Sequence, residues 1–353
     1  MKIVVFGLTI SSSWGNGHAT LWRSLVRALG ANGHRVCFFE KDTPYYSAHR
    51  DLTALDGHDL HLYKEWNAVA AAARRAVETC DAAIVTSYCP DAQAATDVVC
   101  GATAPRKVYY DLDTPVTLAA LRAGEKVDYL PCDGLSAFDL VLSFGGGPVL
   151  EELRSRLGAR RVAPLYGSVD PDAYQRTDGT DIYRSDVTYL GTFAPDRQAA
   201  LDALFLEPAR RRPELRFLLG GSMYPQDFPW SPNIYYVRHV PPPEHANLYS
   251  SCRITVNVTR GPMAEMGFCP SGRLFEAAAC GTPVLSDDWA GLDTFFEPGR
   301  EILIAHTADE ATDALERSPE ELAAIGRRAR SRALECHSAD RRALEFEQLL
   351  AST

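Results

Sequence analysis

The sequence predicts an α/β protein with two domains, each built around a parallel sheet. A chain of 353 residues is long for one domain and sufficient for two, each with its own buried core. In both halves of the chain, short apolar runs typical of buried strands alternate with helix patterns. Between the halves, the stretch from Tyr166 to Ser185 is rich in turn residues and acids and has no apolar period, as expected of a linker. We therefore place the domains at residues 1–167 and 168–335, with a last helix in 336–353.

The first domain begins with a strand–loop–helix–strand unit. Its strands are the apolar runs Lys2–Leu8 and Arg35–Glu40, and between them lie the loop Thr9–His18 and the helix Ala19–Ala31. Such a unit makes its two strands parallel. The alternation continues through these expected elements: helix Trp66–Thr79, strand Ala82–Thr86, helix Ala92–Cys100, strands Lys107–Asp111 and Phe138–Ser143, helix Val149–Leu157 and strand Val162–Leu165.

A second α/β series begins at the strand Asp186–Leu190. Because parallel strands end at one edge of a sheet, the loops after these strands are where an α/β domain binds its ligands. The expected elements of this series are helix Arg197–Arg210, strands Arg216–Gly220, Ile234–Val237 and Arg253–Val258, helix Arg273–Cys280, strands Thr282–Ser286 and Ile302–Ala305, and helices Thr307–Arg317, Pro319–Glu335 and Ser338–Leu350.

The loop after the first strand contains the sequence Gly15-Asn-Gly17-His18. A dinucleotide-binding fingerprint would need a glycine at position 20, which is Thr20, so the loop argues against an NAD site. His18 could act as a general base toward an acceptor hydroxyl or contact a donor phosphate, with Gly17 keeping the site open. The alternative is a histidine that caps its own helix or packs under the loop.

Two acids follow a strand that ends at the same edge of the first sheet. Asp111 and Asp113 are separated by one residue, so they point to opposite sides if the strand continues, and only one is expected to face a ligand. Either could be a general base or bind an acceptor hydroxyl. Capping of the helix before Pro115 is the alternative role.

The stretch Cys269–Asp288 predicts a loop, a short helix and a buried strand. Ser271 and Gly272 lie where the helix begins, so backbone N–H groups and the positive end of the helix dipole could bind an anion there. Arg273 adds a bidentate phosphate donor, and Glu276, one turn later, could accept hydrogen bonds from a sugar diol. Helix capping alone, or an ion pair between the arginine and the glutamate, is the alternative explanation.

This stretch, with Trp289–Asp293 and Phe296–Ile302 after it, resembles the donor-site segment of CgeB-like (spore maturation protein) glycosyltransferases. The resemblance implies the GT-B fold, in which two Rossmann-like domains face each other across a cleft and the last helix crosses back onto the first domain. It also implies that Glu276 holds the donor ribose and Arg273 the pyrophosphate. Many retaining enzymes of this fold have a second glutamate eight positions upstream, where this chain has Phe268, so the stereochemical course stays open.

Three other loops of the second domain carry candidate binding residues. Gly191 and Thr192 end a strand and mirror the Gly-His loop of the first domain. The resemblance implies that the loop of His239 and Val240 receives the nucleobase through backbone groups. Arg260, just after a core strand, is a second candidate phosphate ligand, with a surface cation as the alternative.

Together these patterns predict a glycosyltransferase that moves a sugar, of the hexosyl type, from a nucleoside-diphosphate sugar to an acceptor hydroxyl or similar nucleophile. UDP- and TDP-sugars are the expected donors, and the acceptor could be a small molecule, a glycan or a protein. Arginines and a helix N-terminus can stabilise the leaving diphosphate, so we expect no metal and no tightly bound cofactor. A nucleotide-sugar epimerase on the same fold and a noncatalytic nucleotide- or carbohydrate-binding protein are the alternatives.

Charge and composition argue against several other classes of protein. The net charge of −10 disfavours nucleic-acid binding, which needs a basic surface. The nine cysteines are scattered without the paired spacing of zinc sites, which fits a reduced cytoplasm better than a disulfide framework. The chain starts directly with a strand and has no apolar run of membrane-spanning length, so we expect a cytoplasmic protein; peripheral membrane contact and oligomeric state are left open.

Overall fold

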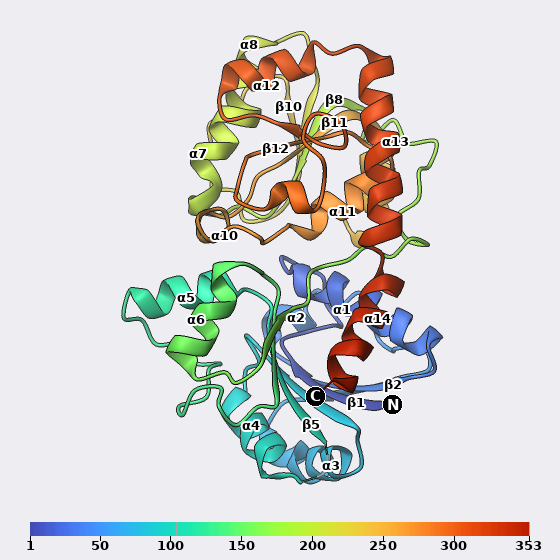
Figure 1. Cartoon of the computed structure of the whole chain (residues 1–353). Helices are drawn as coiled ribbons and strands as arrows, with labels where there is room; N and C mark the ends of the chain where they lie inside the picture. Colours follow the sequence, from blue (N-terminus) through green and yellow to red (C-terminus); the bar gives the residue numbers. More distant parts are fainter. Residues whose placement is uncertain (104, 353) are drawn as a thin grey trace. The chain divides into compact units, whose positions relative to one another are not determined.

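The computed structural model describes residues 1–103 and 105–352, and they form two compact units (Figure 1). The first unit runs from Met1 to Tyr166 and also includes the chain from Ala339 to the end of the described residues. The second unit is Gly167–Ser338. Each unit has one parallel sheet with helices packed on it, which confirms the predicted α/β class.

The sheet of the first unit reverses its strand order next to its first strand. Among the described residues it has seven parallel strands in the order β3-β2-β1-β4-β5-β6-β7. The order proceeds outward from β1 to β3 on one side and from β4 to β7 on the other, so the switch point lies between β1 and β4. The strands are β1 Lys2–Gly7, β2 Arg35–Lys41, β3 Asp59–Tyr63, β4 Ala82–Thr86, β5 Arg106–Asp111, β6 Leu140–Ser143 and β7 Val162–Pro164.

The helices of the first unit bury an apolar core against this sheet. One core cluster joins strand residues such as Phe6 and Phe39 to residues of α3, α4 and α6, such as Val77, Val99 and Leu153. The last helix, α14, packs against α1, and its Glu347 accepts a hydrogen bond from Asn32. The helices are α1 Gly17–Ala31, α2 Pro44–Ser47, α3 Trp66–Glu78, α4 Ala92–Gly101, α5 Thr114–Arg122, α6 Pro148–Leu157 and α14 Ala339–Ala351.

The edge strand β3 is an element that the sequence pattern did not predict. It pairs in parallel with β2, but its residues Asp59 to Leu62 are half-buried or exposed and only Tyr63 is buried. A strand with so little buried apolar surface has no strong sequence signal, because its pairing depends on the backbone of the neighbouring strand.

The second unit repeats the same plan. Its described strands lie in the order β10-β9-β8-β11-β12-β13, all parallel, so the switch point lies between β8 and β11. The strands are β8 Ser185–Leu190, β9 Phe217–Gly220, β10 Ile234–Val237, β11 Cys252–Asn257, β12 Val284–Ser286 and β13 Leu303–Ile304.

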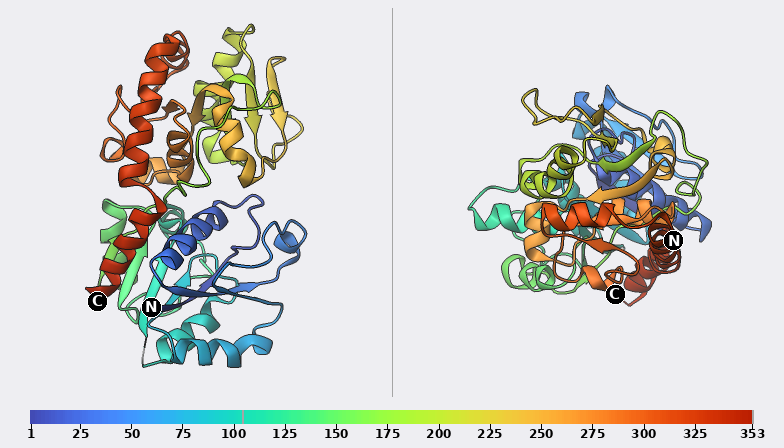
Figure 2. Two further views of the ribbon diagram at one scale, coloured as in Figure 1. Left: turned by 90° about the vertical axis from the view of Figure 1, so that its right-hand side faces the viewer. Right: turned by 90° about the horizontal axis from the view of Figure 1, so that it is seen from above.

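The helices of the second unit include two short ones that the sequence pattern missed, α9 and α10. Each has six residues, which is too short for an apolar period to show. The predicted helix Arg197–Arg210 is present as a helical run that contains a π-helical turn at Asp202–Leu206. The long helix α13 packs beside α11 (Figure 2). The α-helices are α7 Gln198–Leu201, α8 Glu207–Arg211, α9 His245–Ser250, α10 Gly261–Met266, α11 Gly272–Ala279, α12 Ala308–Leu315 and α13 Pro319–Cys336.

None of the helices formed by residues 1–103 and 105–352 has an apolar stretch long enough to cross a membrane.

Candidate active site

Three arginines gather at the carboxyl edge of the second sheet. Arg197 follows the loop after β8, and Arg260 follows β11 as the N-cap residue of α10, so the two flank the switch point. Arg273 is the second residue of α11. Ligands of α/β sheets bind at such an edge, beside the switch point.

Each of the three guanidinium groups makes contact with a neighbouring residue. Nη1 of Arg197 donates to the backbone oxygen of Thr192 at 3.0 Å, while its Nε has no hydrogen-bond partner among the described residues. Nε of Arg260 donates to Asp196 at 3.1 Å. Among the described residues, the guanidinium of Arg273 makes only a long contact, from Nη1 to the Ser271 hydroxyl at 3.5 Å. Several guanidinium N–H groups are therefore available to an acceptor that the chain itself does not supply.

The charges of these arginines act on one another. Burial lowers the pKa of the Arg197 guanidinium, and the positive charges of Arg273 and Arg260 lower it further. Asp196 is the carboxylate that balances part of this charge, through its ion pair with Arg260. An uncompensated cluster of cations is costly away from water, so the site favours an anion with more than one negative charge.

The N-terminus of α11 adds backbone donors to this cluster. Ser271 is the N-cap residue, and its hydroxyl accepts from the N–H of Arg273 at 3.4 Å. A side chain added at Gly272 would meet no atom within 4 Å, so the space beside the first helical residue is open. Capping and anion binding are thus compatible here, because the cap leaves that open side unfilled.

Glu276 is paired with a histidine and not with Arg273. Its carboxylate is buried on α11, and Oε2 lies 3.6 Å from Nδ1 of His245. Burial by itself would raise the pKa of Glu276, but the nearby His245, together with Arg273 and Tyr174, outweighs it and leaves the pKa below its usual value. The carboxylate is therefore ionised at neutral pH and can accept hydrogen bonds.

The other predicted binding loops lie at the same edge of the second sheet. Gly191 directly follows β8; its N–H donates to the oxygen of Gly220, and its own oxygen accepts from the hydroxyl of Tyr224. The loop of His239 and Val240 follows β10, and the oxygen of Val240 is 3.1 Å from Nε2 of His245. These loops are fixed by hydrogen bonds within the second unit.

In the first unit the structure brings together His18 and Asp113. Nε2 of His18 lies 3.2 Å from Oδ2 of Asp113, although the residues are 95 positions apart, and both side chains are less than one fifth exposed. His18 does not cap its own helix, because Asn16 is the N-cap residue and accepts from the His18 N–H. Asp113 occupies the N-cap position of α5 without making the capping hydrogen bond. Its carboxylate is therefore available to orient the imidazole.

Nδ1 of His18 has no hydrogen-bond partner among the described residues. If Asp113 holds the proton on Nε2, Nδ1 is left as the basic nitrogen of the ring. Gly17 begins α1, and a side chain added there would meet no atom within 4 Å. Asp113 is therefore placed to orient the imidazole as a carboxylate orients a general base, and the unpartnered Nδ1 is itself buried.

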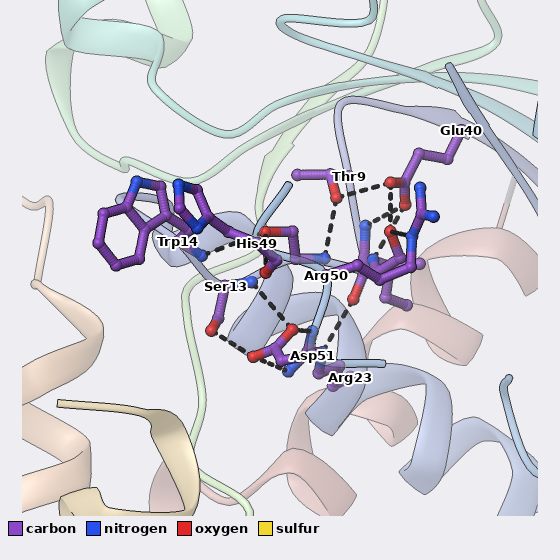
Figure 3. Close-up of polar contacts among 11 residues, drawn as sticks. Thr9, Ser13, Trp14, Arg23, Glu40, His49, Arg50 and Asp51 are labelled. Carbon is purple, nitrogen blue, oxygen red and sulfur yellow. Dashed lines mark hydrogen bonds and ion pairs between the residues drawn. The ribbon is translucent and has the colours of Figure 1, made fainter. Parts of the chain in front are cut away.

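Two carboxylates fix the loop that leads to His18 (Figure 3). Glu40, fully buried at the end of β2, accepts from the hydroxyls of Thr9 and Ser11 and from two backbone N–H groups of the loop, at 2.5–2.9 Å. Asp51 accepts from the N–H and the hydroxyl of Ser13. Because these acceptors bind the loop along its length, the start of α1 is held in one place.

Strained backbone also marks the loops at these edges. Tyr88, Met223 and Phe268 are the non-glycine residues with positive φ among those described. Tyr88 and Met223 follow the carboxyl ends of β4 and β9, and Phe268 lies between α10 and α11. The ring of Tyr88 meets the ring of His18 edge-on, with centroids 5.6 Å apart. Strain of this kind costs about 1–3 kcal/mol per residue and is concentrated at functional sites.

Asp111 lies apart from the His18–Asp113 pair. It is fully buried, its Oδ1 accepts from the N–H of Asp113 at 3.0 Å, and its Oδ2 has no hydrogen-bond partner among the described residues. Burial raises its pKa to about 6, and the hydrogen bond from the Asp113 N–H only partly opposes the shift. Asp111 therefore holds the backbone of Asp113 at the start of the loop after β5.

We expect Asp111→Asn to stabilise the protein above pH 6. Between its usual pKa of 3.8 and about 6, the folded chain binds more protons at Asp111 than the unfolded chain does, so the free energy of unfolding falls as the pH rises through this range. Above pH 6 the variant avoids a cost of up to about 3 kcal/mol. Urea unfolding at pH 4 and pH 8 measures this, with exposed Asp56→Asn as the control. An equal effect of Asp111→Asn at both pH values would contradict it.

Arg197, His245 and Tyr174 are the candidate site residues that the sequence pattern did not single out. The sequence pattern places Arg197 in a helix, yet its position soon after β8 is the same signal that identifies Arg260 after β11. His245 and Tyr174 have no such signal. They reach Glu276 only through the packing of separate segments.

Two further findings concern metals and cysteines. Within the described part of the chain, no group of three or more His, Cys, Asp or Glu side chains could hold a metal ion. All nine cysteines are free thiols.

Comparisons with known proteins identify glycosyltransferases as similar in sequence and in fold. Residues 197–348 match a family model described as glycosyl transferase-like. Sucrose-phosphate synthase from Thermosynechococcus elongatus has a similar structure, with a TM-score of 0.71, 16% identity and 100% of both chains covered. Anabaena HepE, solved in complex with UDP-glucose, is also similar, with a TM-score of 0.69, 14% identity and 100% of both chains covered. No curated protein sequence matches the chain.

A third similar structure is the catalytic domain of starch synthase IV from Arabidopsis thaliana, solved with ADP and acarbose. Its TM-score is 0.66 at 11% identity, with 99% of this chain and 98% of that chain covered. At these identities the structures establish the fold, and the family match covers the arginine cluster and the helix α11. The chain has the GT-B fold of glycosyltransferases, and its family match and fold support the predicted transfer of a sugar from a nucleoside-diphosphate sugar.

Proposed function

We propose that the carboxyl edge of the second sheet binds the donor of a glycosyl transfer, a nucleoside-diphosphate sugar. The observation that carries this proposal is the gathering of Arg197, Arg260 and Arg273 beside the open N-terminus of α11. A diphosphate supplies the multiple negative charges that such a cluster needs. As the sugar leaves, the same groups stabilise the charge that develops on the departing diphosphate.

We assign the remaining predicted residues of the second unit to the rest of the donor. Glu276 accepts hydrogen bonds from the ribose hydroxyls, and the loop of His239 and Val240 receives the nucleobase through its backbone. Gly191 and Thr192 line the diphosphate side, because Thr192 holds Arg197. Support for a hexose donor with a uracil base comes from the similar Anabaena protein, which was solved with UDP-glucose.

In the first unit we propose that His18 is the general base and Asp113 the residue that orients it. His18 takes the proton of the acceptor hydroxyl while the acceptor oxygen bonds to the anomeric carbon and the bond from that carbon to the diphosphate oxygen breaks. Asp113 stabilises the imidazolium that forms. Glu40 and Asp51 keep the loop before His18 in place.

The resemblance to CgeB-like proteins remains part of this proposal, supported by the segment that follows α11. The acceptor is proposed to be a hydroxyl-bearing small molecule, glycan or protein. We also propose a reducing compartment such as the cytoplasm, because the cysteines are free thiols and five of them are buried.

A thermal-shift panel tests the donor site. We expect one of UDP, GDP, TDP, CDP and ADP to raise the melting temperature of the wild-type chain, because a ligand that binds the folded state stabilises it by mass action. Glu276→Ala should reduce this shift, because the ribose loses its acceptor. NAD is the control ligand. A shift with NAD alone, or none with any nucleoside diphosphate, would contradict the donor site.

A further inference from the structure

The carboxylate of Glu276 lies within a cluster of ring side chains from other parts of the second unit. His245 is the first residue of α9, and Tyr174 lies on the segment before β8. Tyr249, one turn after His245, is buried and close enough for the charge of Glu276 to act on its hydroxyl. These three residues come from distant parts of the sequence, and each of them interacts with Glu276.

His245 connects Glu276 with the proposed nucleobase loop. Its Nε2 lies 3.1 Å from the oxygen of Val240, and since a carbonyl only accepts, Nε2 carries the hydrogen. Nδ1 lies 3.2 Å from the hydroxyl of Tyr174 and 3.6 Å from Oε2 of Glu276. A neutral ring accepts from Tyr174 at Nδ1, and a protonated ring donates toward Glu276. In both protonation states the imidazole of His245 lies between the backbone of Val240 and the carboxylate of Glu276.

One polar group in this cluster has no partner. The hydroxyl of Tyr249 makes no hydrogen bond with any described residue, although the side chain is 1% exposed. A buried O–H without an acceptor is costly, and such groups are normally satisfied. The charges of Glu276 and Arg273 both act on this hydroxyl. The cluster therefore contains a buried donor that has no acceptor among the described residues and that feels the charge of Glu276.

We propose that His245 is a positioning residue that fixes Glu276 for the two ribose hydroxyls, so that the site selects ribonucleotides over 2′-deoxyribonucleotides. The inference rests on the proposed donor site. A ribose diol donates two hydrogen bonds to a carboxylate, and a 2′-deoxyribose donates one. The deoxy analogue leaves a buried acceptor unpaired, a loss that is largest when the carboxylate cannot turn away. Of the two expected donors, UDP-sugar is then favoured over TDP-sugar, because the nucleoside of TDP contains 2′-deoxyribose in place of ribose.

The test compares a ribonucleotide with its 2′-deoxy counterpart by calorimetric titration. The pair is UDP and 2′-deoxy-UDP, or the corresponding pair for whichever base the thermal-shift panel selects. We expect wild type to prefer the ribonucleotide by roughly tenfold or more, the effect of one charge-assisted hydrogen bond. His245→Phe should lower the ribonucleotide affinity until the two affinities are nearly equal, with little change for the deoxy compound.

Two further variants separate positioning from a general structural effect. His245→Gln keeps a side-chain N–H for Val240 and should restore part of the preference. His306→Phe changes an exposed histidine of the same unit and should leave the preference as in wild type. If His245→Phe does not fold, the comparison rests on His245→Gln, which should then show an intermediate preference.

Other outcomes would overturn one proposal or the other. An unchanged preference in His245→Phe, with both affinities lowered equally, would show a structural role only. A wild-type chain that binds both nucleotides equally would also overturn the inference while leaving the donor site intact. Absence of binding by any nucleoside diphosphate would instead overturn the proposed function.

Discussion

Replacing Arg273 with alanine should weaken the binding of a nucleoside diphosphate by roughly 10- to 100-fold. Hydrogen bonds to charged groups contribute about 1.5–3 kcal/mol each. The guanidinium of Arg273 makes only one long contact with the described residues, so its N–H groups are available to the ligand. The unliganded chain should keep its melting temperature, because no ion pair among the described residues depends on Arg273. Calorimetric titration of the variant and wild type measures the loss.

A matched control for this experiment is Arg300→Ala. Arg300 is an arginine of the same unit whose side chain is 65% exposed and pairs with Glu297. Its replacement removes the same charge without changing one of the three arginines of the proposed site. We expect wild-type affinity from the control. Arg197→Ala should also weaken binding, but with some loss of stability, because its guanidinium holds the loop at Thr192. An Arg273→Ala variant that binds as tightly as wild type would remove the basis of the proposed donor site.

His18→Ala should reduce kcat by about 10²- to 10⁴-fold, the usual contribution of a general base. The affinity for the donor diphosphate should be retained, because the donor is assigned to the second unit. Asp113→Asn should cause a smaller loss, since the amide can still contact Nε2 but no longer stabilises the imidazolium. Release of nucleoside diphosphate from the donor selected by the panel, with water or an added sugar as acceptor, measures both variants.

The control for the base assignment is His61→Gln. His61 is exposed on β3 and stacks on Phe39, so its replacement removes a histidine of the first unit without touching the His18–Asp113 pair. Wild-type turnover is expected from it. If His18→Ala loses donor affinity and turnover in parallel, His18 contributes to donor binding and is not the base.

The fold was largely predictable because most strands carry a buried apolar run. All five residues of β4 are buried, and Val187 to Leu190 of β8 form a similar run, so their sequences show the pattern directly. The edge strand β3 and the short helices α9 and α10 lack such a run. Their structure depends on neighbouring elements, and this dependence leaves little trace in the local sequence.

The candidate site was predictable only as a set of loops at one sheet edge. The strand pattern placed Asp111 and Asp113 near His18, but it could not select which acid meets the histidine, because that depends on how the chain turns after β5. In the structure the turn puts Asp113 beside His18 and leaves Asp111 buried beneath it. Likewise, spacing along a helix offered Arg273 as the partner of Glu276, whereas packing of α9 on α11 provides His245.

The most direct measurement is a crystal structure of the chain with the nucleoside diphosphate selected by the thermal-shift panel. We expect the diphosphate oxygens within hydrogen-bond distance of Arg273 and of the backbone N–H groups that begin α11, with the ribose hydroxyls on Glu276. A nucleotide bound elsewhere, or bound there with its phosphates directed away from Arg197, Arg260 and Arg273, would contradict the donor site.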